Sequence, residues 1–165
     1  MGAIEMRTAL SLVILAIAIA GYAHATDAWR LYVNARFGAV ADVPADWTAE
    51  PDPENGDGRT FTAPDGAKVL VYGNWETGDS VVVDAITSPR QGETITYRFH
   101  KNGVYVISGR AGDTLFYRKH VLVCGGKVWV NLEIEYPASK AATYDPMAAH
   151  MAKSLHVATD YCRGL

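Results

Sequence analysis

The chain has no excess of basic residues, no C-x-x-C pair and no apolar run long enough to cross a membrane. It carries 15 Lys and Arg against 18 Asp and Glu, a net charge of −3. Because nucleic-acid binding needs a basic stripe, a polynucleotide partner is excluded. The longest apolar run, 9–20, has 12 residues, whereas a membrane helix needs roughly 20. These absences favour a globular protein without a dithiol redox motif.

Residues 1–25 have the three-part pattern of a secretory signal peptide. Arg7 supplies the charge, the run 9–20 supplies the apolar core, and "AHA" at 23–25 is a small-x-small cleavage site. We expect residues 26–165 to form a single domain with one core, located in the periplasm or outside the cell. Retention of the apolar run as a membrane anchor is the alternative.

The chain contains only two cysteines, Cys124 and Cys162. In the oxidising compartment that the signal peptide indicates, they could form one disulfide. A bridge across 38 residues, the difference between the two positions, would stabilise the fold by roughly 3–4 kcal/mol. Two unpaired thiols are the alternative.

Alternating segments separated by turn residues predict strands in the amino-terminal half. In 37–43 every second residue is apolar, and Pro44 follows. This pattern is typical of a strand that enters the core and stops. The segment 59–73 carries Pro-Asp-Gly at 64–66 between two alternating runs, which predicts a hairpin.

Two helices are predicted. Residues 80–88 have helical spacing, with Asp79 or Ser80 as the cap, although three adjacent valines also suit a strand. Asp145 and Pro146 are typical of a cap and first helical position and predict the start of a carboxy-terminal helix. Its apolar stripe would consist of Met147, Met151, Leu155 and Ala158.

The strongest pattern in the chain lies between residues 93 and 136. Alternating runs are separated by Asn102-Gly103, by a loop at 110–113 and by Gly125-Gly126. These signals predict a four-stranded antiparallel meander. With the other elements it gives an α+β fold, in which helices flank a twisted antiparallel sheet of about six to seven strands.

Two-residue turns fix strand register, so partners can be assigned from the sequence. His100 should lie opposite Tyr105, and Arg118 opposite Glu133; a four-residue loop at 110–113 would place Tyr105 opposite Arg118. The apolar face, expected to pack on the carboxy-terminal helix, carries Ile95, Tyr97, Phe99, Val104, Val106, Leu115, Tyr117, Val121, Val123, Val128, Val130, Leu132 and Ile134. The opposite face carries His100, Tyr105, Arg118 and Glu133, flanked by Arg98, Ile107, Phe116, His120, Asn131 and Glu135.

This opposite face is the candidate binding site. Arg118 would clamp an anion, because a guanidinium matches carboxylate and phosphate groups. Tyr105 and Phe116 would form an aromatic floor, with His100 and Glu133 at its sides. The alternative is a solvated sheet face, where the Arg118–Glu133 pair contributes at most about 1 kcal/mol.

The acidic segment 50–58 invites a calcium interpretation, since Asp52, Glu54 and Asp57 are hard oxygen ligands. The spacing differs from a calcium-binding helix-loop-helix motif, because Gly56 stands where the third ligand belongs. A solvated acidic loop is the better account, and the sequence indicates no metal or cofactor.

Catalytic patterns are weak. The chain lacks a G-x-S-x-G elbow, and Ser108 lies on the apolar face, so a triad with His100 and Asp113 would have to reach through the sheet. A hydrolase that uses His100 or His120 remains one alternative function. Another is a hydrolase inhibitor, for a lysozyme or a protease, whose loop 108–113 projects a rigid, basic tip.

From residue 32 to residue 156 the chain resembles a group of small secreted proteins of proteobacteria with a PsbP-like fold. The resemblance is carried by "YVNARFGAVADVPADW", "ENGDGRTFTAPDGAKVLVYG", "ITYRFHKNGVYVISGRAGDTLFYRK" and "LEIEYPASKAATYDPMAAHMAKSL". It implies a twisted antiparallel sheet flanked by helices and a non-enzymatic, protein-docking role. Our leading hypothesis is therefore a non-catalytic module that docks an envelope protein or a small anionic ligand, through the open sheet face or the 50–58 loop.

Overall fold

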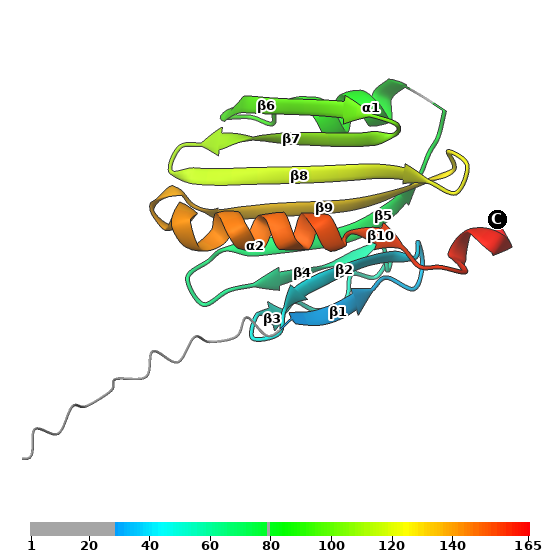
Figure 1. Cartoon of the computed structure of the whole chain (residues 1–165), viewed down its shortest axis with the longest axis horizontal. Helices are drawn as coiled ribbons and strands as arrows, with labels where there is room; N and C mark the ends of the chain where they lie inside the picture. Colours follow the sequence, from blue (N-terminus) through cyan, green and yellow to red (C-terminus); the bar gives the residue numbers. More distant parts are fainter. Residues whose placement is uncertain (1–28, 79) are drawn as a thin grey trace, which may run out of the picture.

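The structure is a computed structural model that describes residues 29–78 and 80–165 (Figure 1). The predicted signal peptide and Asp79 lie outside these residues. Within them the chain forms two antiparallel sheets, of three and seven strands. The α+β prediction is confirmed.

The small sheet has the order β1-β2-β10, and the large sheet the order β3-β4-β5-β9-β8-β7-β6. The strands are β1 (Trp29–Val33), β2 (Ala39–Pro44), β3 (Thr48–Ala49), β4 (Gly58–Thr62), β5 (Lys68–Trp75), β6 (Glu93–Lys101), β7 (Val104–Ala111), β8 (Thr114–Val123), β9 (Val128–Pro137) and β10 (His156–Val157). The helices are α1 (Ser80–Thr87) and α2 (Ala141–Ser154), with short 3₁₀ turns at Ala138–Lys140 and Tyr161–Gly164.

The predicted first strand runs through the core. Phe37, Ala39, Ala41 and Val43 are all buried, and Pro44 is the last residue of β2. Strand β1, which was not among the predicted strands, pairs with β2 along its whole length.

The hairpin of β4 and β5 and the four-stranded meander are confirmed. At the β6–β7 turn, Asn102 and Gly103 both have positive φ, at 51° and 74°. This conformation suits the twist of a two-residue hairpin, and it places His100 opposite Tyr105 as predicted. The β8–β9 register, with Arg118 opposite Glu133, is also as predicted.

The predicted register between β7 and β8 is wrong by two residues. Tyr105 lies opposite His120, and Arg118 lies opposite Ile107. The cause is a turn of two residues, Gly112 and Asp113, in place of the predicted four-residue loop, because the strands continue to pair up to the turn. An even shift leaves each side chain on its predicted face, since side chains alternate with a period of two.

The large sheet has a different helix on each face. Helix α2 packs on β9, β8 and β2, and the core lies between the two sheets beneath it. Helix α1 contacts β7 from the other side. Figure 1 shows α2 lying along β9, with β6 and β7 extending beyond it and α1 behind them.

Helix α2 begins earlier than predicted, at Ala141, so Pro146 lies inside it. Tertiary contacts explain the difference. Tyr144 is buried, with an edge contact to Trp47, and its hydroxyl donates to Asp65 in the β4–β5 turn. These contacts fix a helical turn before the proline. In the predicted stripe, Met151 and Leu155 are buried, Met147 is half-buried, and Ala158 lies beyond the helix.

Helix α1 confirms the prediction of a short helix that ends before Pro89. The helical spacing of Val81, Val82, Ala85 and Ile86 predicts that these residues share the inner face; Val82 and Ile86 are half-buried as expected, whereas Ala85 is exposed.

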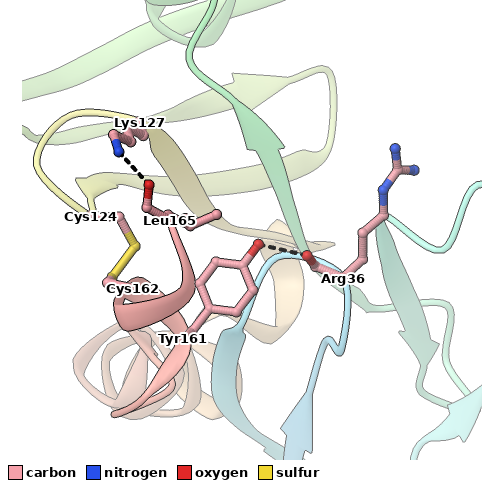
Figure 2. The surroundings of a disulfide bond; sticks show 6 residues. All are labelled: Arg36, Cys124, Lys127, Tyr161, Cys162 and Leu165. Carbon is pink, nitrogen blue, oxygen red and sulfur yellow. Dashed lines mark hydrogen bonds between the residues drawn. A yellow bond between two sulfur atoms is a disulfide. The ribbon is translucent and has the colours of Figure 1, made fainter.

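The predicted disulfide between Cys124 and Cys162 is present (Figure 2). It attaches the carboxy-terminal segment to the β8–β9 turn. The Tyr161 hydroxyl donates to the backbone oxygen of Arg36 at 2.6 Å, and its ring lies against Gly38, where a Cβ would clash with it. The segment is therefore held at both the turn and the β1–β2 connection.

Candidate functional site

The face predicted to be open is largely buried. Arg118 is 2% exposed and His120 is 1% exposed, and Ile107, Phe116 and Glu133 are also buried. The prediction that these side chains face solvent, either as a binding surface or as a polar sheet face without a ligand, is therefore wrong. Helix α1 and the segment 88–93 lie over this part of the sheet and supply the side chains that contact it.

Arg118 has its charge matched inside the protein. Its guanidinium donates twice to the carboxylate of Glu93, with Nη1 to Oε2 at 3.0 Å, and its Nε lies 3.3 Å from Oε2 of Glu133. The guanidinium carbon also lies 4.5 Å from the centre of the Phe116 ring. With two carboxylates already in place, Arg118 has no capacity for the anionic ligand that the sequence analysis expected.

Glu133 is the second centre of this network. Arg90 reaches it from the 88–93 segment with two nitrogens, at 2.8 and 2.9 Å, and the Tyr72 hydroxyl donates to it at 2.9 Å. Burial alone would raise the pKa of Glu133, but the hydrogen bond and charge of Arg90 outweigh it, so the pKa lies below its usual value. The pKa of Tyr72 is raised, first by burial and then by Glu133.

The pKa of Glu93 is also lowered. Burial opposes the ionised form, but hydrogen bonds from Arg118 and from the backbone amide of Arg90 prevail. The network of Arg90, Glu93, Arg118 and Glu133 is thus formally neutral; we call it the buried ion network, since three of its side chains are buried and only that of Arg90 is half exposed, at 51%. Its geometry is that of a structural clamp, which attaches the 88–93 segment to β8 and β9.

His120 lies beside this network and belongs to a chain of neutral groups. Its Nδ1 is 2.9 Å from Oδ1 of Asn131, whose Nδ2 donates to Asn74 at 2.9 Å. Burial lowers the pKa of His120 more than the Asn131 hydrogen bond raises it. The ring is therefore neutral at physiological pH and out of reach of solvent, which removes the geometric basis for a hydrolase that uses His120.

His100 and Tyr105 are the two predicted site residues that reach the surface. His100 is exposed and Tyr105 half-buried, and their rings stack at 3.8 Å between centres. Tyr105 also makes an edge contact with Trp129 at 5.5 Å. The structure therefore separates the five predicted site residues into an exposed pair and a buried trio.

A cavity of about 240 Å³ opens next to the buried ion network. Its charged lining is mostly paired, with Arg90 on Glu133 and Lys68 3.2 Å from Glu135. The Oε1 of Glu50 accepts from the Thr62 hydroxyl at 3.0 Å. This arrangement offers no surplus cation to an anionic ligand.

The opposite side of the meander, predicted to be entirely core, is open over β6 and β7. Tyr97 is 52% exposed and Phe99 is 41% exposed. Around them lie the side chains of the same face that are half-buried or at the margin of the core; together we call this surface the aromatic face, which consists of Tyr97, Phe99, Val104, Val106 and Tyr117. Ile95, predicted on this face, lies on the opposite one, because the bulge between Ile95 and Tyr97 shifts the register and places Ile95 opposite Gly109.

Helix α2 stops short of the aromatic face. The amine of Lys119 on β8 donates to the backbone oxygen of Ala152 near the end of α2, at 2.6 Å, and burial lowers the pKa of this amine. A groove of about 320 Å³ lies between the sheet and α2, with Leu115, Tyr117 and Ala148 in its walls. The aromatic face is therefore a surface with a groove along one side.

Sequence reasoning missed this surface although a signal was available. A helix is about 10 Å wide and strands lie about 4.8 Å apart, so one helix covers about two strands. In a four-stranded meander with one carboxy-terminal helix, about half of the apolar face must therefore be covered by other elements or remain exposed. Here the small sheet and α2 cover β5, β9 and part of β8.

The segment 108–113 does not form the projecting tip that the inhibitor hypothesis required. Ser108 and Gly109 lie within β7, and Gly109 is buried. The connection to β8 consists of Gly112 and Asp113, and the Nε of Arg110 donates to the backbone oxygen of Gly112 at 3.0 Å. This is a tight turn at the end of the sheet.

In residues 29–78 and 80–165, no three His, Cys, Asp or Glu side chains are grouped so as to hold a metal ion. In the 50–58 loop, the residues from Glu50 to Asn55 are exposed. None of the helices in these same ranges has the length and apolar character needed to cross a bilayer.

No protein-family model matches the sequence, and a search of curated proteins found no match. The fold is similar to solved structures at low sequence identity. The solution structure of cyanobacterial PsbP (CyanoP) from Synechocystis sp. PCC 6803 aligns with a TM-score of 0.57 and 14% identity, over 82% of this chain and 95% of that one.

A mutant of the protein Mog1 aligns with a TM-score of 0.55 and 10% identity, over 82% of this chain and 99% of that one. LpqN, described as involved in cell envelope biogenesis of Mycobacterium tuberculosis, aligns with a TM-score of 0.51 and 15% identity, over 79% of this chain and 91% of that one. At these identities the similarity establishes the fold, which is PsbP-like, and leaves function to be argued from the surface.

Proposed function

We propose that the protein is a non-catalytic docking module of the cell envelope, periplasmic or secreted, that binds a protein partner through the aromatic face. The observation that carries this proposal is the exposure of Tyr97 and Phe99, side by side on a sheet face that α2 leaves uncovered. We further propose that the chain belongs to the small secreted proteins of proteobacteria that its sequence resembles.

The exposed apolar area of Tyr97 and Phe99 is large enough for its burial to contribute substantially to binding. Two aromatic side chains that are roughly half exposed leave on the order of 200 Å² of apolar area in water. Burying that area would contribute about 5 kcal/mol as an upper estimate, at about 25 cal/mol per Å². Exposed aromatic clusters of this kind are enriched at the centres of protein interfaces.

The compartment is supported by the disulfide between Cys124 and Cys162, because such bonds persist in oxidising environments. LpqN, which has the same fold, is described as involved in cell envelope biogenesis. Both observations favour an envelope location.

Docking is preferred to catalysis and to small-ligand binding because of where the charges lie. The groups that a mechanism would use, Arg118, Glu133 and His120, are buried and engaged with one another or with neighbouring side chains. His100, the exposed histidine of the meander, is stacked on Tyr105. The polar groups of the meander thus support the fold, and the aromatic face remains for recognition.

The proposal is tested by site-specific photo-cross-linking in intact cells. A photoreactive phenylalanine derivative at position 99 should give a discrete cross-linked partner, whereas the same group at Thr143, which is exposed on α2, should not. Adding Tyr97→Ser should abolish the product. Adding Leu31→Ser, which removes an apolar residue that is 63% exposed on another surface, should leave it unchanged. Equal products from positions 99 and 143 would overturn the proposal.

A further inference from the structure

We propose that the edge of β6 receives an extended, acidic segment of the partner as an additional strand. This inference rests on the proposed function, because it specifies how a partner on the aromatic face is held and what its chemistry is. It depends on three observations: the open edge, the direction of its backbone groups, and its charge.

Strand β6 is the long edge of the seven-stranded sheet, whereas the opposite edge, β3, has only two residues. All residues from 96 to 101 are exposed. A bulge between Ile95 and Tyr97 interrupts the pairing with β7, but from Tyr97 to Lys101 the register is regular. Five residues of regular edge strand are therefore available, and Figure 1 shows β6 at the border of the sheet.

The backbone groups of this edge follow from the turn. Lys101 and Val104 flank the two-residue turn, and such a pair exchanges both of its hydrogen bonds. Because bonded and non-bonded pairs alternate, Phe99 bonds to β7, while Arg98 and His100 direct their N–H and C=O groups away from the sheet. An added strand would satisfy these outward groups, as in other complexes formed by strand addition.

The edge is cationic in a chain whose net charge is −3. Arg98 and Lys101 are exposed on it, with His100 between them. The nearest acid in sequence, Glu93, is committed to Arg118. One Arg98 nitrogen donates to the backbone oxygen of Thr87 at 2.7 Å, which leaves the rest of the guanidinium free. Charge complementarity therefore favours acidic side chains on the incoming strand.

A second copy of this chain is a poorer occupant. Its own β6 would bring the same cations to the interface, since Arg98 and Lys101 have no free carboxylate on β6 to face. Like charges across paired strands are destabilising. The favoured partner is a different chain, with acids on the face of Arg98 and His100 and apolar residues on the face of Tyr97 and Phe99, where Lys101 lies at the end of the strand.

The binding test uses a synthetic, end-capped heptapeptide that alternates valine with glutamate, and a matched peptide with lysine in place of glutamate. We expect the acidic peptide to bind at least tenfold more tightly, with affinity falling as salt rises. Hydrogen exchange at the amides of Arg98 and His100 should slow on binding. Equal affinity for both peptides, or no protection of these two amides, would overturn the inference.

Two variants separate the backbone from the side chain. His100→Pro removes the outward N–H without removing a bond to β7, and proline is tolerated at such edge positions. It should reduce acidic-peptide binding at least tenfold, whereas His100→Ala should stay within about twofold of the unmodified protein. Equal binding by the two variants would exclude strand addition.

A third variant keeps the test valid if His100→Pro does not fold. Arg98→Glu with His100→Glu, which reverses the charge of the face that both residues share, should reverse the preference toward the lysine peptide, and an unchanged preference would contradict the inference. Sedimentation that shows a dimer, with Arg98 and His100 protected before peptide is added, would assign the edge to a second copy instead. If cross-linking from position 99 persists in His100→Pro, the aromatic face docks a partner and only strand addition is wrong.

Discussion

One face of the β6–β9 meander buries Arg118, Glu133 and His120 beneath α1 and the segment that follows it, whereas the other face exposes Tyr97 and Phe99 beside α2. The charged side chains are thus more buried than the aromatic ones. The comparison shows that the burial of a sheet face depends on which elements pack on it, more than on whether its side chains are polar or apolar. A polar face can be buried when neighbouring segments bring matching charges, and an apolar face stays exposed where the covering helix ends.

The two faces also differ in how strongly the loss of one side chain should affect the stability of the fold. In the buried ion network each charge compensates another, so losing a buried member leaves its partners without their counter-charge where little water can replace it. On the aromatic face Tyr97 and Phe99 keep much of their surface in solvent, so the loss of either changes the fold little. Substitutions on the two faces should therefore separate stability from binding.

The largest effect is expected for Arg118→Ala. This change leaves Glu93 and Glu133 buried without their shared partner, which should lower the free energy of unfolding by about 3–5 kcal/mol. Urea denaturation monitored by circular dichroism measures it. Arg98→Ala, on the exposed edge, is the matched control and should cost less than about 1 kcal/mol. A loss of similar size for both variants would remove the distinction between the faces.

Removing the disulfide should have the next largest effect and leave both faces intact. Cys124→Ser with Cys162→Ser should lower the free energy of unfolding by about 2–4 kcal/mol, since the closed loop spans 38 residues. Hydrogen exchange should accelerate at the Ala158 amide, which bonds to Gly38, and remain unchanged in β7 and β8. Faster exchange in the meander would mean that the disulfide also supports the faces.

The pH dependence of stability should come in part from the buried ion network. The pKa values of Glu93 and Glu133 are lower in the folded protein than their ordinary value of 4.5. Their contribution is therefore fully present above pH 4.5 and is lost as the pH falls through the lower folded values. Glu93→Gln should make the decline of the unfolding free energy between about pH 5 and about pH 3 shallower. An unchanged slope would show that the network carries no titrating contribution.

The smallest stability effect is expected on the aromatic face. Tyr97→Ser and Phe99→Ser should each change the free energy of unfolding by less than about 1 kcal/mol, because the side chains are already about half exposed. Val106→Ser, on the same face but 8% exposed, should cost more, about 1–3 kcal/mol. Thermal and urea unfolding of the three variants gives the comparison. A larger decrease in the free energy of unfolding for Phe99→Ser than for Val106→Ser would contradict the assignment of Phe99 as exposed and Val106 as buried.

Most of the fold could be predicted from local chemistry. The alternation of side chains and the positive-φ residues Asn102 and Gly103 fixed one register, and the β8–β9 turn fixed another. The face assignments survived the error at the β7–β8 turn, but the bulge in β6, which no local pattern indicates, moves Ile95 to the face opposite the predicted one. The pairing of Cys124 with Cys162 followed from there being only two cysteines.

Two features could not be predicted because they depend on distant contacts. The start of α2 is determined by Tyr144, which is held by Asp65 from the β4–β5 turn, and this outweighs the local preference for a start at Pro146. The burial of Arg118 depends on where α1 and the segment 88–93 pack, which periodicity does not encode. Local patterns report which side chains share a face, but not what lies on top of that face.

The two-residue turn at Gly112 and Asp113 has a consequence for how this protein can vary. Lengthening or shortening the connection by an even number of residues would slide β7 along β8 while every side chain keeps its side. An odd change would turn the whole β6–β7 hairpin over, sending Tyr97 and Phe99 under α1, and Arg98 and His100 toward α2. We therefore expect natural and designed variants to tolerate length changes at this connection in steps of two.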